Sequence, residues 1–336
     1  MTGASDTGPD MPSHAMEHTT TVAIAGIPLV VTSNSKAVLT AFAARYDLAT
    51  APTNEAVGCT SRIVVTPGGD PGDAQGRPQW DFGDEPRITA TGRGFSAAID
   101  MNLGAVTATV SEAFVRGNPH FRTTVLEGAS LLAINRKDRH PVHAATVRQG
   151  DAAIVLCGSS GVGKSTLAYV ADRAGFDVLA DDSTRVQLTP SLRVWGEGQR
   201  PIVHLLSSVR RQRSELRDLE PDWLSSHGEA KLSVRVRARA LTPPCASAVR
   251  VCLLSRDRSG LWRRPATPRE IEDAIVNAPE AVADRAPEQR IRVAAALAAP
   301  GGWRLNLSSQ PEDAIPQLRE MFASLTVPSR RAIPEE

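Results

Sequence analysis

Residues 158–186 read GSSGVGKSTLAYVADRAGFDVLADDSTRV, and this stretch decides the fold. An apolar run at 152–156 precedes it and predicts a buried strand, while residues 165–174 show the periodicity of an amphipathic helix. Gly175 is placed to end that helix, and residues 176–180 predict a second strand. A strand, a glycine-rich loop, a helix and another strand in succession indicate an α/β fold.

The glycine-rich loop matches the phosphate-binding loop pattern in full. Its glycines let the backbone curl so that successive N–H groups point at phosphate oxygens, and the following helix adds its positive N-terminal end. Lys164 is expected to reach the β- and γ-phosphates, and the Ser165 hydroxyl is the expected magnesium ligand. Because strand, loop and helix are all present, a glycine-rich turn without nucleotide is the weaker interpretation. The predicted nucleotide-binding residues are Gly158, Ser159, Ser160, Gly161, Val162, Gly163, Lys164, Ser165 and Thr166.

An acidic pair, Asp181 and Asp182, follows the strand at 176–180. Strands of α/β folds present their ligands at their carboxyl ends, so this pair is expected beside the phosphate loop. Two carboxylates there can divide the binding of magnesium and the acceptance of a proton from a substrate hydroxyl. The alternative is that Asp182 simply begins a turn, as aspartate often does.

Together these residues resemble one family. The run from the loop to the aspartate pair is similar to the core of HPr kinase/phosphorylase and its HPr-kinase-related relatives. Phosphoenolpyruvate carboxykinases share the layout, but the spacing resembles the kinase group more. The strong match covers residues 143–186, with HPVHAATV at 140–147 resembling the histidine-containing strand before the loop. VHLLSS at 203–208 and GGWRLNLSS at 301–309 follow the looser pattern of the relatives.

The resemblance implies an α/β fold with a P-loop kinase core of the HPr kinase/phosphoenolpyruvate carboxykinase type, built on a mixed twisted sheet. It implies a kinase that uses ATP and Mg²⁺ to phosphorylate a hydroxyl, in the first place a serine or threonine of a peptide or protein, otherwise a small metabolite. The catalytic candidates are Asp181, Asp182, Lys164 and His143, and the metal ligands are Ser165 and Asp182. For His143, a structural role in a partly buried position is an equal alternative.

The sequence also departs from the family. The bifunctional enzyme carries an acidic residue directly after its loop serine, where this chain has Thr166, and the signature tied to phosphorylase activity is not found. A kinase of the related group is therefore expected, and a phosphorylase activity stays open. The sequence also leaves open whether the nucleotide is ATP or GTP and how the two aspartates divide their roles. The identity of the acceptor and a homo-oligomeric state stay open as well.

Two other functions fit the same motif. A non-catalytic sensor would bind ATP and regulate a partner, so substitution of Asp181 would change little beyond metal affinity. A carboxykinase-like metabolic enzyme would need a second anion pocket for a dicarboxylic acid, and the sequence shows no motif for one. Adjacent carboxylates favour activation of a hydroxyl, so the kinase is the leading hypothesis.

Basic residues gather after the core strands. Arg210, Arg211, Arg213 and Arg217 are expected on a helix and loop, and Arg235, Arg237 and Arg239 alternate as they would on one face of a strand. They could cover the triphosphate or bind an acidic peptide. A solvated face balanced by Glu215, Asp218 and Glu220 is the more ordinary interpretation. Lys231 is a weaker candidate for a phosphate contact.

Composition restricts the partners. The formal net charge is +1 at pH 7, which predicts neither a nucleic-acid nor a membrane partner. No run approaches the roughly 20 apolar residues that span a bilayer, and no secretory signal is recognisable, so a cytoplasmic location is expected. The four cysteines lack metal-ligand spacing and are expected to be small buried hydrophobic residues. They are Cys59, Cys157, Cys245 and Cys252.

The chain is expected to divide into a disordered tail at 1–18, an α+β module at 19–137 and the nucleotide-binding domain at 138–336. In the module, residues 20–31 predict two short strands or a hairpin. Ser33, Asn34 and Ser35 supply cap candidates for a helix that carries Val38, Leu39, Phe42 and Tyr46. Further strands are expected at 62–65, 87–90, 95–99 and 105–110, a surface loop at 67–86 and a mixed segment at 123–135. In the second domain, strands are expected at 143–147, 186–188, 193–195 and 249–254, and helices that begin at or near proline at 268–277, 287–297 and 311–325.

Overall fold

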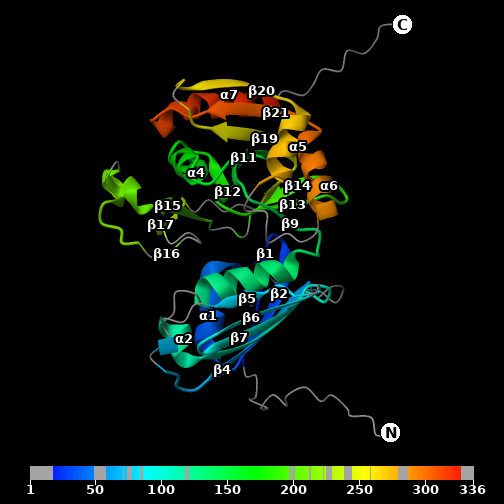
Figure 1. Cartoon of the computed structure of the whole chain (residues 1–336), viewed down its shortest axis with the longest axis vertical. Coiled ribbons are helices and arrows are strands. Elements are labelled where there is room, and N and C mark those ends of the chain that lie inside the picture. The colour runs from blue at the N-terminus through cyan, green and yellow to red at the C-terminus, as the bar shows by residue number, and fades with distance from the viewer. Residues whose placement is uncertain are drawn as a thin grey trace.

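The fold is a mixed α/β arrangement seen in a computed structural model (Figure 1). The described residues are 18–48, 58–70, 72–73, 78–83, 86–117, 121–196, 198, 201–211, 213–221, 223–224, 229–237, 244–257, 259–278 and 287–326. The predicted disordered tail at 1–18 lies outside these residues, apart from His18, which begins the first strand.

The N-terminal residues form an eight-stranded sheet, as far as the structure describes them. In spatial order its strands are β3 (Asp47–Leu48), β1 (His18–Ile24), β2 (Ile27–Ser33), β4 (Cys59–Thr66), β8 (Ala105–Ser111), β7 (Phe95–Asp100), β6 (Arg87–Gly92) and β5 (Gln79–Asp81). β2, β4 and β8 run parallel, and the other pairs are antiparallel. The sheet is therefore mixed.

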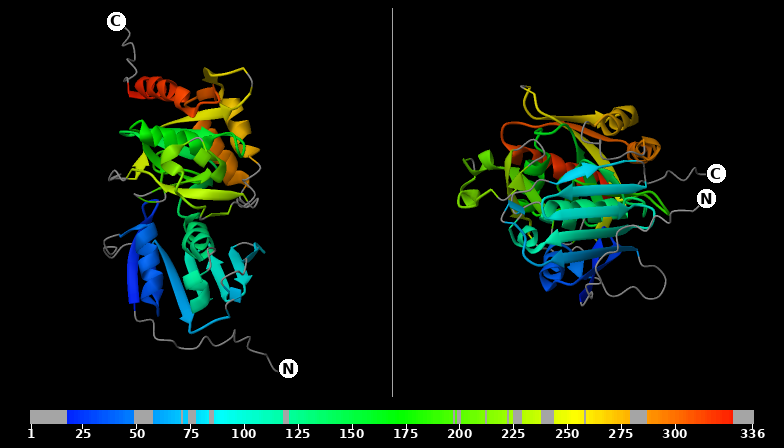
Figure 2. Two further views of the ribbon diagram at one scale, coloured as in Figure 1. Left: turned by 90° about the vertical axis from the view of Figure 1, so that its left-hand side faces the viewer. Right: turned by 60° about the horizontal axis from the view of Figure 1, so that its bottom comes forward.

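One face of this sheet carries the N-terminal core. Buried and exposed residues alternate along β6 and β7, which is the pattern of a sheet with one packed and one solvated face. The packed face is covered by α1 (Lys36–Arg45), α2 (Glu112–Gly117), the π-helix η2 (Phe121–Ala129) and α3 (Ser130–Ile134). Figure 2 shows the strands of this sheet side by side when the bottom of the molecule comes forward.

Most predictions for the module are confirmed. The hairpin at 20–31 is β1 and β2, and α1 buries Val38 and Phe42. The expectation of an unbroken loop at 67–86 is wrong, because β5 pairs with β6 and extends the sheet edge. That strand is only three residues long, so its own sequence carries too little periodicity to reveal it.

The central C-terminal sheet holds the strand before the glycine-rich loop, the candidate phosphate loop. Its order is β12 (Asp177–Ala180), β10 (Ala145–Gln149), β11 (Ala152–Cys157), β19 (Ala248–Ser255), β21 (Gly302–Asn306) and β20 (Trp262–Ala266). β11, β19 and β21 are parallel, whereas β10 is antiparallel to both of its neighbours. β12 consequently points the same way as β11, with β10 between them.

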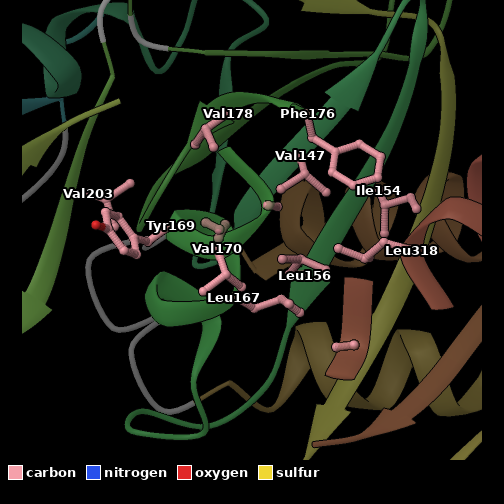
Figure 3. Packing of buried hydrophobic residues seen from close by; sticks show 14 of the residues in the cluster. Val147, Ile154, Leu156, Leu167, Tyr169, Val170, Phe176, Val178, Val203 and Leu318 are labelled. Carbon is pink, nitrogen blue, oxygen red and sulfur yellow. The ribbon is translucent and has the colours of Figure 1, made fainter. Parts of the chain in front are cut away.

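Both faces of β11 are buried. Ile154 and Leu156 face α4 (Lys164–Arg173) and α7 (Ala314–Thr326), while Ala153 and Val155 face the opposite side. Figure 3 shows Leu318 of α7 against the β11 side chains. Covering on both sides explains why residues 152–156 read as a continuous apolar run, as in other sheets that helices cover on both faces.

The opposite side is covered by α5 (Pro268–Val276) and α6 (Pro287–Ala298). α5 begins with a capping box between Thr267 and Glu270, and both helices start at proline as predicted. The expected helix at 311–325 is split into a 3₁₀ turn, η6 (Pro311–Asp313), and α7. Pro316 lies in the first turn of α7, where a missing N–H costs no helical hydrogen bond.

Two smaller sheets contain the remaining described strands. The first contains β18 (Cys245–Ala246), β14 (Arg193–Trp195), β13 (Thr184–Gln187) and β9 (His140–Val142). The second, called the side sheet below, contains β15 (Ile202–Leu206), β17 (Ala230–Arg235) and β16 (Trp223–Leu224). Two 3₁₀ turns follow β15, η3 (Ser207–Arg211) and η4 (Ser214–Leu216).

The side sheet has two different faces. Val203 and Leu205 of β15 and Leu232 and Val234 of β17 are buried against α4. Figure 3 shows Tyr169 of α4 beside Val203. Because side chains alternate along strands, the residues between these apolar ones point away from α4.

Arg139 joins the N-terminal sheet to the later residues. Its guanidinium lies 4.4 Å from the ring centroid of Trp195, and Nε donates to the carbonyl of Ala25 at 2.7 Å. Trp195 in turn packs against the N-terminal core. The predicted boundary between residues 137 and 138 lies directly before this junction and stays a prediction.

Candidate phosphate-binding site

Five strand ends meet at one edge of the central sheet. The register places Ala145 of β10 beside Leu156 of β11, and Thr146 of β10 beside Ala180 of β12. The loop after β11, the aspartate pair after β12 and His143 before β10 therefore lie at the same edge. The ends of β19 and β21 lie there too, as expected for a ligand site in an α/β fold.

The phosphate loop has a backbone that suits anion binding. Gly161 and Gly163 adopt φ of 78° and 118°, values that side chains with a Cβ rarely adopt. Val162 is buried and anchors the loop, and its N–H donates to the carbonyl of Ser159 at 3.2 Å. Ser159, Ser160 and Gly161 are exposed. The loop is thus anchored through Val162, while Ser159, Ser160 and Gly161 stay accessible.

Lys164 is the first residue of α4 and is buried, with 6% of its surface exposed. Its ammonium donates to the carbonyls of Gly158 at 2.8 Å and Ser159 at 3.3 Å. These contacts hold the charge against the inner side of the loop. Ser165 and Thr166 follow in the first turn of α4, where backbone N–H groups have no helical acceptor.

A cleft of about 1270 Å³ opens beside the loop. His143 and Asp182 line it together with loop residues 158–162, and α5 provides one further wall. Leu131, Leu132 and Trp80 of the N-terminal residues line it as well. The volume exceeds the roughly 300–1,000 Å³ of typical ligand pockets, so the cleft has room for a nucleoside triphosphate.

The two aspartates occupy different environments. Asp181 is buried, and its Oδ2 accepts a hydrogen bond from the backbone N–H of His204 at 2.7 Å. Its Oδ1 is buried and has no hydrogen-bond partner in the part of the chain that the structure describes. The Asp182 side chain is 57% exposed, and its Oδ1 lies 3.3 Å from Nδ1 of His143. The pair therefore offers one fixed carboxylate and one accessible carboxylate.

A second, smaller cavity of about 270 Å³ lies on the other side of the pair. Asp181 and Asp182 line it, as do Lys231 and His204 of the side sheet and Arg45 of α1. No sequence motif predicts this cavity, because the residues that line it come from segments far apart in the sequence. Lys231, a weak candidate in the sequence, is thus placed beside the aspartate pair.

Arg256 is a site residue that sequence reasoning missed. It follows β19 and lines the cleft, and a methyl group added to Gly163 would lie 3.3 Å from its Nη2. Arg256 is exposed and makes no hydrogen bond or ion pair with the described residues. A single arginine after a strand carries no sequence signal, since only the sheet order places it beside the loop.

The arginine cluster is balanced by acidic side chains, as predicted, but Arg213 is not on a solvated face, because its side chain is 13% exposed. Arg213 pairs with Glu312 at 2.6 Å, and Arg210 lies 3.4 Å from Glu220. β17 ends at Arg235, so the predicted continuous basic strand face does not reach Arg237. The backbone N–H of Arg237 donates to Asp172. Arg239 lies outside the described residues.

The cysteines are buried and unpaired by disulfides, which confirms their prediction as small core residues. Burial raises the pKa of the Cys157 thiol to about 12 and that of Cys59 to about 11. Although Cys157 directly precedes the loop, its thiol stays protonated at neutral pH and is a poor nucleophile.

The loop and the aspartate pair fit magnesium and phosphate together. Among the described residues, no group of three or more His, Cys, Asp or Glu side chains is arranged to hold a metal ion. Mg²⁺ is commonly bound through one or two carboxylates plus substrate phosphates and water. The buried, unpartnered Oδ1 of Asp181 also calls for a donor or a cation. The residues at this edge therefore match a nucleotide-bound magnesium ion.

No helix among the described residues has both the length and the apolar character needed to cross a membrane.

Comparison with known proteins found no matching family model and no matching curated protein. A solved structure of the Hpr(Ser) kinase/phosphatase from Coxiella burnetii is similar at 9% sequence identity and a TM-score of 0.24. The match covers 55% of this chain and 95% of that one. Likeness at this level indicates a distant relationship at most, so the function proposed below rests on the residues of this chain.

Proposed function

We propose that the chain is a Mg-ATP-dependent kinase that transfers the γ-phosphate of ATP to a hydroxyl group. One observation carries the proposal. The phosphate loop with its buried Lys164 and the pair Asp181–Asp182 stand at the same sheet edge, separated by β10 alone. The residues that we assign to phosphate binding and to proton acceptance thus lie on one side of the fold.

The phosphate loop has three tasks in this proposal. Its backbone N–H groups and the N-terminal end of α4 bind the phosphate oxygens. Lys164 leaves its contacts with Gly158 and Ser159 to reach the β- and γ-phosphates, where it neutralises charge that builds up during transfer. Ser165 and Asp182 would hold Mg²⁺, which would supply positive charge to the phosphates at the loop.

The exposure of the two aspartates divides their roles. Asp182 lines the cleft beside the loop and is accessible, so it is assigned to the metal. Asp181 is fixed through Oδ2, and its Oδ1 is left to accept the proton of the attacking hydroxyl. His143 lies 3.3 Å from Asp182 and orients that carboxylate.

The proposal extends to the division of the chain into two parts. We propose that residues 138–336 form an HPr-kinase-like nucleotide-binding domain and residues 19–137 a separate module. The support is the mixed central sheet, in which antiparallel β10 lies between the loop strand and the aspartate strand. The pattern of loop, helix, strand and Asp-Asp supports the assignment at the level of the residues.

The test is a transfer reaction. The purified chain, Mg²⁺ and γ-labelled ATP are mixed with fractionated extract from its own source, and the label is located in protein, peptide, metabolite or free phosphate. We expect transfer to one acceptor, lost in Lys164→Ala. Binding of ATP without label transfer in any fraction would instead favour the non-catalytic sensor, and absence of ATP binding would refute both.

We expect Asp182→Asn to raise the Mg²⁺ concentration needed for half-maximal rate by about tenfold or more. The amide removes a negative charge from a hard-cation ligand. Initial rates over a Mg²⁺ titration at fixed ATP measure the effect. Asp218→Asn, an exposed change in the arginine-rich segment, is the control and leaves the titration unchanged. An unaltered Mg²⁺ requirement in Asp182→Asn would remove this residue from the metal site.

We expect Arg256→Gln to lower kcat/KM for ATP by about tenfold to a hundredfold, since a hydrogen bond to a charged group contributes roughly 1.5–3 kcal/mol. The guanidinium beside Gly163 has no competing carboxylate among the described residues and is available for a phosphate. Arg250→Gln on the same strand is the matched control, because that guanidinium donates to the carbonyl of Val249 away from the cleft. Equal losses in both variants would contradict a phosphate contact.

A further inference from the structure

The smaller cavity on the far side of the aspartate pair has the character of a second binding site. Its volume of about 270 Å³ suits a molecule of a few carbon atoms. Asp182 and Ser183 line both this cavity and the large cleft beside the phosphate loop. A molecule in the smaller cavity would therefore lie next to a nucleotide in the cleft.

Asp181, one of the residues that line the cavity, has a carboxylate oxygen without a hydrogen-bond donor. Asp181 is nine-tenths buried, and its Oδ1 is enclosed without a partner among the described residues, whereas Oδ2 already binds the His204 N–H. A buried carboxylate oxygen without a donor is costly. A hydroxyl group in the cavity would supply the missing donor.

Lys231, another lining residue, carries a charge without an acidic partner among the described residues. Lys231 is paired with Leu206 and His204 with Ser233 in the side sheet, so all four project from the face that points away from α4. Lys231 forms no ion pair with any residue that the structure describes. Lysine is also rare in this chain, where Lys36, Lys137, Lys164 and Lys231 are all that occur. Of these, Lys164 lies at the loop and Lys231 lines this cavity.

The remaining charges of the cavity largely neutralise each other. Nε of Arg45 lies 2.6 Å from Oε1 of Glu127, and both side chains are nearly buried. Arg45 comes from α1 and Glu127 from η2, so the N-terminal residues close the cavity. Lys231 is consequently the cation left to meet an anionic group of a ligand, and Asp181 is the group left to meet a hydroxyl.

We propose that this cavity binds the phosphate acceptor, and that the acceptor is a small molecule with a hydroxyl and one anionic group, a carboxylate or a phosphate. The hydroxyl lies against Oδ1 of Asp181 and the anionic group against Lys231. This inference rests on the proposed kinase function and specifies its substrate class. Such a molecule would take the place of the peptide serine expected from the sequence.

The reaction balances with ATP as the second substrate. The acceptor hydroxyl gives its proton to Asp181 as its oxygen bonds to the γ-phosphorus. The bond between that phosphorus and the β–γ bridging oxygen breaks, and ADP leaves with the electron pair. The products are ADP, the phosphate ester and one proton, which Asp181 returns to solvent. No oxidant or reductant is required.

The test uses the full chain with Mg-ATP and three sets of acceptors. The first contains glycerate, lactate and serine, each with a hydroxyl and one carboxylate, and the second contains glycerol 3-phosphate. The third is a short serine peptide blocked at both ends, which has the hydroxyl without the anion. We expect ADP formation and a new phosphate ester with a member of the first or second set, which decides between carboxylate and phosphate. The blocked peptide is expected to remain unmodified.

Two variants and two readouts keep the tests separate. We expect Lys231→Gln to raise KM for the acceptor by about tenfold to a hundredfold, while the dissociation constant for ATP is unchanged. Lys36→Gln, an exposed change on α1, is the control and should change neither the acceptor KM nor ATP binding. Thermal unfolding with the acceptor alone gives a readout without turnover, and the rise in Tm seen for the wild type is lost in Lys231→Gln. Transfer to the blocked peptide, or an unchanged acceptor KM in Lys231→Gln, would overturn the acceptor assignment. Loss of ATP binding in the wild type would instead overturn the kinase itself.

Discussion

Replacing Lys164 by alanine is expected to lower kcat by about a thousandfold, which corresponds to roughly 4 kcal/mol of transition-state stabilisation. In the structure the ammonium is held by the carbonyls of Gly158 and Ser159, so the charge is already positioned beside the phosphate site. Its removal leaves the charge that develops on the phosphoryl oxygens without its nearest cation.

Single-turnover transfer from γ-labelled ATP measures this loss directly. Lys36→Ala removes an exposed lysine at the start of α1 and is the control for a change of net charge. Thermal unfolding of both variants separates a lost function from a lost fold. A Lys164→Ala protein that is folded and keeps the wild-type rate would show that the loop does not take part in transfer.

The second large effect is expected for Asp181→Asn, which should lower kcat by about a hundredfold to ten-thousandfold, the range for loss of a general base. Asparagine has nearly the same shape and can still accept the hydrogen bond from the His204 N–H through its oxygen. The amide cannot take up a proton from a hydroxyl. Dissociation constants for ATP should therefore stay close to the wild-type value while the chemical step fails.

Comparison with Asp182→Asn makes this result specific. If Asp182 serves the metal, added Mg²⁺ restores much of the rate in Asp182→Asn but none in Asp181→Asn. The reverse pattern would exchange the two roles. Wild-type rates in Asp181→Asn would show that this carboxylate is not the general base of the transfer.

The sequence predicted those parts of the site that lie close together in the chain. The loop, α4, β12 and the aspartate pair occupy fewer than thirty consecutive positions, and local glycine pattern, helical period and apolar runs were enough to place them. His143 lies 3.3 Å from Asp182 and lines the cleft with the loop residues, while its predicted role at a phosphate site stays a prediction. The mixed α/β character of the fold followed from the same stretch.

The other parts depend on tertiary contacts. Arg256 reaches the loop because β19 is the neighbour of β11, although about a hundred residues separate the two strands in sequence. Lys231, Arg45 and Glu127 meet at the smaller cavity from the side sheet, α1 and η2. No local period links such residues, and their types are common on protein surfaces.

The antiparallel strand β10 limits which features of the site substitutions can change. Adjacent strands lie about 4.8 Å apart, so the ends of β11 and β12 are separated by about 10 Å. Main-chain hydrogen bonds set that interval, and no side chain takes part in setting it. Substitutions around the edge can therefore change which ligand is held, while the distance between the glycine-rich loop and the aspartate pair stays constant. A different distance between the ends of β11 and β12 would require a strand between them to be gained or lost.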